Sequence, residues 1–303
     1  MRKTFGLMTT LALVAVNAAA LAQPPAGPNP AAPAAPPTLE SCATLVAGRG
    51  GPPPGAPGAP GAARGPAAAG APARGPAAPG VAAPARGPAP PATPATEPRA
   101  RDDGRHKCFL LIAQKTRFDV LFVGDSITDW WQMTNRGKPE WDKTFVPLKA
   151  ANFGIAGDTT QGVLWRMQNG ELSGFKTKVI VFMLGTNNIN RNSPAEIAAG
   201  DAMIIREFRK QQSQARVLVL GVFPRGMAAD NPFRAQIREL NYHLSHVADQ
   251  ANVTYMDIGD KFLTADGTLT TEIMADGLHP TLKGYGIWAD AIRDKVKELL
   301  RKA

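Results

Sequence analysis

Two short motifs hold residue types that together can transfer an acyl group to water. Gly-Asp-Ser at 124–126 presents a hydroxyl directly after an apolar run, and Asp-Gly-Leu-His-Pro at 276–280 presents a carboxylate and an imidazole. In that chemistry Ser126 is the nucleophile, His279 takes its proton, and Asp276 orients the imidazole. Each motif also has a structural interpretation: Gly-Asp-Ser forms ordinary turns and helix caps, and Asp276 can cap a turn while His279 lies on the surface. Only the two motifs together favour catalysis.

Donors for a developing oxyanion stand in two further loops. With the Ser126 N–H, the N–H of Gly157 and the side-chain amide of Asn187 make up the set. The structural alternatives are that Gly154 and Gly157 are turn residues and that Asn187 bonds its own backbone. Asp158, beside Gly157, is interpreted as the cap of the following helix rather than as a catalytic group.

Apolar runs and helical patterns alternate through the carboxyl-terminal part of the chain. The apolar, β-prone runs predict strands at 119–123, 150–153, 178–184, 216–222 and 253–257. Helical spacing predicts helices at 159–169, 194–212, 232–250 and 280–302. This alternation predicts an α/β fold with a parallel sheet and helices on both faces. The polar clusters then follow strands and meet at the carboxyl edge of the sheet, where ligands bind in such folds.

Four blocks follow one another in a fixed order: Gly-Asp-Ser at 124–126, Gly157, Gly-Thr-Asn-Asn at 185–188 and Asp-Gly-Leu-His-Pro at 276–280. They resemble the four blocks of the SGNH (GDSL-type) hydrolase family. More narrowly, three segments are similar to the catalytic subunits of platelet-activating-factor acetylhydrolase and their bacterial relatives, namely 152–161, 164–166 and 220–226.

The resemblance implies a flavodoxin-like three-layer α/β/α sandwich with a five-stranded parallel sheet, the SGNH hydrolase fold. It also implies the roles of nucleophile, base, acid and two oxyanion donors for Ser126, His279, Asp276, Gly157 and Asn187. One departure is Ile127, which stands where the family has leucine, a volume-conserving exchange. The Gly-x-Ser-x-Gly elbow of the α/β-hydrolases is missing, because position 128 is threonine.

The predicted acyl pocket is small. Its candidate residues adjoin the catalytic motifs and are Ile127, Thr186 and Leu278. The little room that they leave predicts a short acyl group such as acetyl. The predicted activity is hydrolysis of short-chain carboxylic esters through an acyl-enzyme, on a small-molecule or polymer-borne substrate of the carbohydrate or lipid class, with no metal or organic cofactor. Two other functions stay open: acyl transfer to a sugar hydroxyl, and a tethered, non-catalytic glycan-binding module.

The first residues have the pattern of a secretory signal peptide. Arg2 and Lys3 precede an apolar stretch that ends in a small-x-small cleavage pattern at 20–22. A retained signal anchor is the alternative. The predicted organisation is a signal peptide, a disordered Ala/Pro/Gly-rich tether and an SGNH hydrolase domain, at 1–22, 23–100 and 101–303. A secreted or periplasmic location follows, with no membrane span after cleavage.

The net charge and the two cysteines indicate which binding partners and which bonds are expected. The formal net charge is +9 at pH 7, but no basic run is interleaved with aromatics, so nucleic acid is not an expected partner. The two cysteines, Cys42 and Cys108, permit one disulfide in an exported protein and lack the spacing of a metal site. The sequence leaves their pairing open, and it predicts no oligomeric state.

The remaining histidines and three of the tryptophans are interpreted as non-catalytic residues. His243 and His246 stand on one predicted helix without an evident third ligand, so they are interpreted as surface residues. His106 is interpreted as a solvated residue ahead of the domain. Core or rim packing, rather than a sugar platform, is predicted for Trp130, Trp131 and Trp141.

Overall fold

The computed structural model describes residues 37–42, 93–101, 103–247 and 252–303. The predicted signal peptide and most of the predicted tether lie outside these residues. Among the helices described, none combines the length and the apolar character that crossing a membrane requires.

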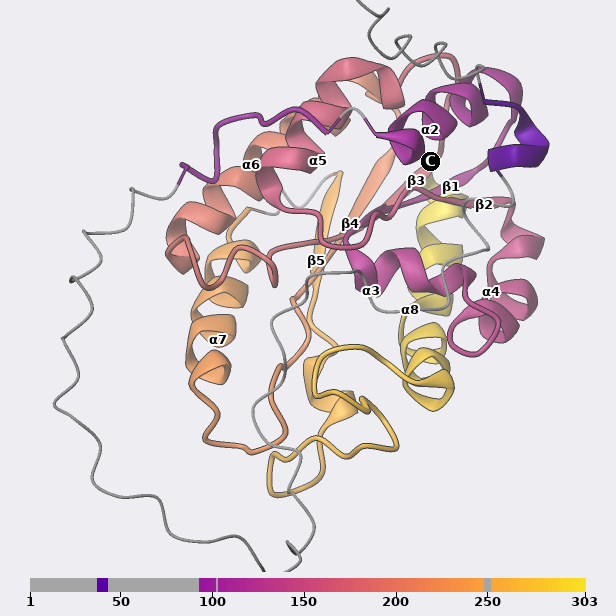
Figure 1. Ribbon diagram of the computed structural model, residues 1–303. Helices are drawn as coiled ribbons and strands as arrows, with labels where there is room; N and C mark the ends of the chain where they lie inside the picture. Colours follow the sequence, from indigo (N-terminus) through magenta and orange to yellow (C-terminus); the bar gives the residue numbers. More distant parts are fainter. Residues whose placement is uncertain (1–36, 43–92, 102, 248–251) are drawn as a thin grey trace, which may run out of the picture. The chain divides into compact units, whose positions relative to one another are not determined.

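Five parallel strands form one sheet in the order β2-β1-β3-β4-β5 (Figure 1). They are β1 (Val120–Gly124), β2 (Ala150–Asn152), β3 (Val179–Met183), β4 (Arg216–Leu220) and β5 (Val253–Met256). The parallel pairing of all four neighbouring pairs confirms the predicted sheet. The chain runs outward from β1 in both directions, so the order reverses between β1 and β3. Ligands of doubly wound sheets bind outside the carboxyl ends of the strands at such a point.

Helices cover both faces of the sheet, with α4 and α8 on one side and α5 and α6 on the other (Figure 1). The helices are α2 (Gly104–Lys115), α3 (Ser126–Asp129), α4 (Lys138–Thr144), α5 (Thr160–Arg166), α6 (Pro194–Gln211), α7 (Pro232–Ser245) and α8 (Leu282–Lys302). Short 3-10 or π segments are η1 (Trp130–Gln132), η2 (Val146–Leu148), η3 (Met167–Glu171) and η4 (Gly259–Phe262). The predicted helices are confirmed, although α7 ends at Ser245 and the last three residues of the helix expected at 232–250 lie outside the described residues. The sequence did not predict α2 and α4.

Alternate residues of the central strands face two different cores. Val120 and Phe122 of β1 belong to a buried cluster with α4 and α8. Leu121 and Val123 belong to a second cluster with α2, α5 and α6. Burial on both faces explains why these strands are apolar at every position. The result is a rigid three-layer scaffold whose loops carry the polar motifs.

The segment ahead of α2 packs on the scaffold. The carbonyl oxygens of Thr93 and Pro94 accept hydrogen bonds from the Gln161 side chain at 3.1 and 3.2 Å. The Arg99 N–H donates to the Gln161 carbonyl oxygen at 3.0 Å. The packed region therefore extends to the amino-terminal side of the boundary expected at residue 101.

α2 is attached by a disulfide and by a buried polar pair. Cys108 on this helix is bonded to Cys42. His106, also on α2, is only 3% exposed. Its Nδ1 lies 2.7 Å from Oε1 of Glu171, which is 65 residues further along the chain. The prediction that His106 is solvated is therefore wrong, because its imidazole is buried and paired with a carboxylate from a distant part of the chain.

Candidate active site

Ser126 is the first residue of α3, directly after β1. The turn between them requires Gly124, because a Cβ there would lie 2.2 Å from Thr128 Oγ1. Asp125 caps the helix by accepting the Ile127 N–H at 2.9 Å. As the first residue of a helix, Ser126 has an N–H with no intrahelical acceptor. Its hydroxyl and this N–H both lie at the carboxyl edge of the sheet.

The structure brings Ser126, His279 and Asp276 into one hydrogen-bonded chain. Ser126 Oγ is 2.9 Å from His279 Nε2, and His279 Nδ1 is 2.6 Å from Asp276 Oδ2. An ionised carboxylate can only accept, so Nδ1 carries the proton and donates it to Asp276. Nε2 of the neutral ring then accepts from the Ser126 hydroxyl. This tautomer is the one that proton transfer from serine to histidine requires.

The carboxylate of Asp276 has two roles at once. Its Oδ1 accepts the backbone N–H groups of Leu278 at 3.0 Å and His279 at 2.8 Å, so Asp276 does cap the turn. Its Oδ2 still reaches the imidazole. Partial burial raises the pKa of Asp276, but the hydrogen bonds from the His279 ring and backbone outweigh it and hold the pKa below its ordinary value. The group is therefore ionised throughout the neutral pH range.

Gly157 and Asn187 lie in the loops after β2 and β3. Gly157 has a φ of +76°, a conformation that favours glycine, and a Cβ at this position would meet no atom within 4 Å. Asn187 does not bond its own backbone: its Nδ2 donates to the Asp158 carbonyl oxygen at 2.8 Å. That bond fixes the amide between the two loops and leaves its second hydrogen for a ligand.

Two buried arginines fix the loops after β1 and β2. Arg105 of α2 donates to Asp129 at 2.7 Å and to the Gly154 carbonyl oxygen at 2.8 Å. Arg166 of α5 is fully buried and donates to Asp158 at 2.9 Å. Asp129 ends the helix of the nucleophile, and Asp158 adjoins Gly157. Arg105 therefore joins the nucleophile's helix to the loop after β2, and Arg166 holds the Gly157 end of that loop against α5.

Two further carboxyl groups are buried behind the nucleophile. Burial raises the pKa of Asp125 to about 7. Burial, with a smaller contribution from the charge of Asp125, also raises the pKa of Asp201 on α6 well above its ordinary value. Within the described part of the chain, both carboxyl oxygens of Asp201 lack a hydrogen-bond partner. We conclude that Asp201 is held in its protonated, neutral form.

Trp130 also belongs to the site, although its sequence pattern predicts only core or rim packing. Its ring is stacked on the His279 imidazole, with centroids 3.9 Å apart and planes at 29°. Trp131 and Trp141 lie in the core, as predicted. One signal could have found Trp130: it follows Ser126 by four residues, about one helical turn, so both project from the same side.

The candidate acyl-pocket residues lie in different surroundings. Ile127 is 1% exposed and belongs to the buried cluster formed with α4 and α8, and Leu278 packs against the same cluster. Thr186 is equally buried, and its carbonyl oxygen accepts from Arg225 at 3.2 Å. The structure thus places Ile127 and Leu278 against one apolar cluster, while Thr186 lies in the loop after β3, where Arg225 binds its carbonyl oxygen.

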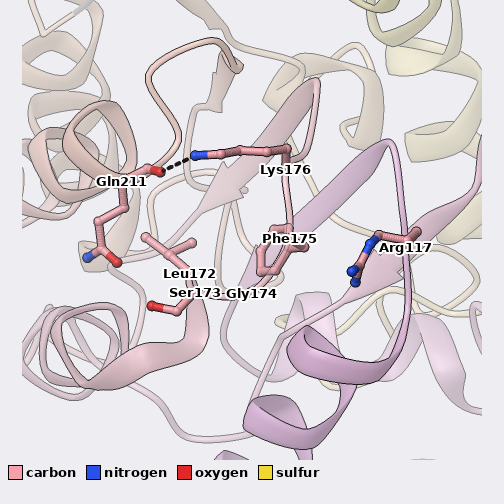
Figure 2. A pocket seen from close by; sticks show the side chains of 7 residues that line it. All are labelled: Arg117, Leu172, Ser173, Gly174, Phe175, Lys176 and Gln211. Atoms are coloured by element: carbon pink, nitrogen blue, oxygen red, sulfur yellow. Dashed lines mark hydrogen bonds between the residues drawn. The ribbon is translucent and has the colours of Figure 1, made fainter.

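A surface hollow of about 700 Å³ lies away from these residues (Figure 2). It is lined by Arg117, Leu172, Ser173, Gly174, Phe175, Lys176 and Gln211. Arg117 precedes β1 and Lys176 precedes β3, so the hollow is at the amino ends of the strands. Ser126 lies at the opposite edge, and no catalytic candidate lines the hollow. Across the described ranges, no group of three or more His, Cys, Asp or Glu side chains is arranged to hold a metal ion.

Comparison with known proteins agrees with this geometry. The platelet-activating factor acetylhydrolase IB subunit alpha2 of Homo sapiens is 38% identical over 218 residues, which are 69% of this chain and 93% of that protein. The corresponding subunit alpha1 of Rattus norvegicus is 34% identical over 216 residues, 68% of this chain and 90% of that protein. A solved structure of a candidate acylhydrolase from Bacteroides fragilis has a TM-score of 0.53 at 20% identity, covering 66% of this chain and 100% of that chain. This last likeness shows the fold alone.

The model of the GDSL-like Lipase/Acylhydrolase family matches residues 122–287. That span contains every residue of the candidate site, namely Ser126, Gly157, Asn187, Asp276 and His279. The predicted three-layer SGNH fold is confirmed by the parallel sheet and its covering helices. With this fold and these relatives, the chain belongs to the GDSL-like lipase/acylhydrolase family and is a carboxylic ester hydrolase.

Proposed function

We propose that this protein is an exported serine esterase that removes short acyl groups, acetyl above all, from a carbohydrate or lipid ester. The observation that carries the proposal is the hydrogen-bonded chain from Ser126 through His279 to Asp276, with distances of 2.9 and 2.6 Å. This chain supplies a nucleophile, a base and an orienting acid in the order that acyl transfer needs.

The chemistry proceeds in two half-reactions. Ser126 Oγ bonds to the carbonyl carbon while its proton passes to His279 Nε2 and the carbonyl π electrons move to oxygen. The oxyanion accepts hydrogen bonds from the N–H groups of Ser126 and Gly157 and from the Asn187 amide. The bond to the alcohol then breaks, and the alcohol oxygen takes the proton from His279. Water repeats these steps on the acyl-enzyme, which releases the carboxylic acid and restores the serine.

Three observations support the finer parts of the proposal. Ile127 beside Ser126 is only 1% exposed and Leu278 beside His279 is partly buried, so neither offers much exposed apolar surface to a long acyl chain. The relatives described above are named acetylhydrolases. Export is supported by the signal pattern of residues 1–22 and by the Cys42–Cys108 disulfide, since disulfides persist in oxidising compartments.

A series of p-nitrophenyl esters of increasing acyl length tests the proposal. The wild type should cleave the acetate fastest, with kcat/KM falling as the chain lengthens. Ser126→Ala should lose activity by a factor of roughly 10⁴ or more. Ser173→Ala is the matched control, because Ser173 is an exposed serine at the opposite edge of the sheet. Wild-type activity in Ser126→Ala would exclude this nucleophile, and a preference for long acyl chains would exclude the acetyl assignment.

The same assay separates the two alternative functions. An acyltransferase would, in the presence of an oligosaccharide acceptor, give acylated sugar in place of free acid. A non-catalytic binding module would give no turnover with any ester. Acetate release from acetylated xylan, acetylated peptidoglycan or an acetylated phospholipid then identifies the alcohol part of the substrate.

A further inference from the structure

The ring of His279 has an aromatic neighbour that comes from the nucleophile's own segment of chain. Trp130 opens η1, which begins directly after α3. The stack on the imidazole has a centroid separation of 3.9 Å. Trp130 is only partly buried, whereas the adjacent Trp131 is fully buried in the core. The two tryptophans therefore have different roles, because Trp131 fills the interior and Trp130 faces the site.

Arg136 adds a second link between the same two parts of the chain. Its Nη1 donates to the carbonyl oxygens of His279 at 3.4 Å and Pro280 at 3.1 Å. Its guanidinium carbon lies 4.7 Å from the centroid of the Trp130 ring. One arginine thus contacts both the indole and the backbone of the histidine loop.

A tight turn holds Arg136 in this place. The Arg136 N–H donates to the Met133 carbonyl oxygen at 2.9 Å, and the Gly137 N–H donates to the Trp130 carbonyl oxygen at 3.3 Å. A Cβ on Gly137 would lie 2.6 Å from Trp131 Cα, so the turn is packed directly against η1. Trp130 and Arg136 are therefore presented by one compact unit that also carries Ser126 at its start.

We propose that Trp130 and Arg136 are positioning residues for the catalytic histidine. Arg136 fixes the backbone of the histidine loop, and the indole of Trp130 holds the imidazole in the plane that joins Ser126 to Asp276. The inference rests on the proposed role of His279 as the base. It goes beyond that role by naming the groups that set the geometry of the proton transfer.

The contact between the Trp130 and His279 rings should stabilise the transition state more than the resting enzyme. In the proposed mechanism the His279 imidazole becomes an imidazolium when it takes the serine proton. The electron-rich face of an indole attracts a cation, so the Trp130 contact strengthens as the proton arrives. Interactions that strengthen in this way raise kcat rather than lower KM. The charge of Arg136 opposes the imidazolium, so its benefit is confined to the hydrogen bonds that anchor the loop.

The test is steady-state kinetics with p-nitrophenyl acetate on the wild type and four variants. Trp130→Leu should lower kcat roughly 3- to 30-fold with KM changed less than about twofold. Trp130→Phe, which keeps an aromatic face over the imidazole, should recover most of that loss. Arg136→Gln should lower kcat by a smaller factor. Tyr242→Leu is the matched control, since Tyr242 on α7 contacts the ring of a different histidine, His246, which caps the end of that helix.

The outcomes separate this inference from the proposed function. Loss of turnover in Ser126→Ala tests the nucleophile and says nothing about the stack. Wild-type kcat in Trp130→Leu, a raised KM at unchanged kcat, or no recovery in Trp130→Phe would each overturn the positioning role. A second readout needs no turnover: the ring-proton resonances of His279 should be shifted upfield by the indole in the wild type and return in Trp130→Leu. Absence of that upfield shift in the wild type would also refute the stack.

Discussion

Replacement of Asp125 by asparagine should stabilise the folded protein, and more so at high pH than at low pH. Burial raises the pKa of Asp125 in the folded state to about 7, from an ordinary 3.8. The folded state therefore holds this proton more tightly than the unfolded chain does. The carboxyl group begins to cost stability as the pH rises through the unfolded pKa, and the cost is complete above the folded pKa. At about 1.36 kcal/mol per pKa unit, it amounts to about 4 kcal/mol near pH 8 and roughly 1.6 kcal/mol near pH 5.

The measurement is urea unfolding of the wild type and Asp125→Asn at both pH values, followed by tryptophan fluorescence. The asparagine side chain keeps an oxygen that can accept the Ile127 N–H, so the helix cap survives. We expect the gain in the free energy of unfolding to be about 2–3 kcal/mol larger at the higher pH. A gain that is equal at the two pH values, or a variant that is less stable near pH 8, would refute the reasoning.

Two further perturbations test the site and its attachment. Asp276→Asn should lower kcat by a factor of roughly 10²–10⁴, because an amide does not select the imidazole tautomer that accepts from Ser126; unchanged kcat would show that Asp276 only caps its turn. Joint replacement of Cys42 and Cys108 by serine should lower the free energy of unfolding by about 2–4 kcal/mol, since the disulfide joins residues 66 positions apart. The reduced wild type should match the double variant in urea unfolding, and equal stability of the oxidised wild type and the double variant would contradict the expectation.

The strands and long helices could be predicted because their signals are local. A strand buried on both faces is apolar at each position, as Val179–Met183 is. The helix α6 begins with a capping box at Ser193 and a proline in its first turn. α2 escaped prediction because its apolar residues form a continuous run rather than a stripe. α4 escaped because Trp141 is its one buried apolar residue, so the sequence shows no apolar stripe.

The polar motifs could also be predicted, whereas their supports could not. Asp276 and His279 are three residues apart, so their bond is visible in the sequence. The partner of His106 is Glu171, 65 residues away, and that of Trp130 is His279 on the last loop of the domain. No local pattern reports such pairs, because packing of distant segments creates them. The sequence therefore indicates the chemistry of the site. Only the folded structure shows which distant residues position the catalytic side chains.

The central claim is that Ser126 is a nucleophile activated by His279. Its most direct test is covalent labelling with a fluorophosphonate, followed by intact mass measurement and peptide mapping. We expect one adduct per chain, located on Ser126, no adduct in Ser126→Ala and much slower labelling in His279→Ala. An adduct on another residue, or labelling of Ser126→Ala at the wild-type rate, would contradict the assignment.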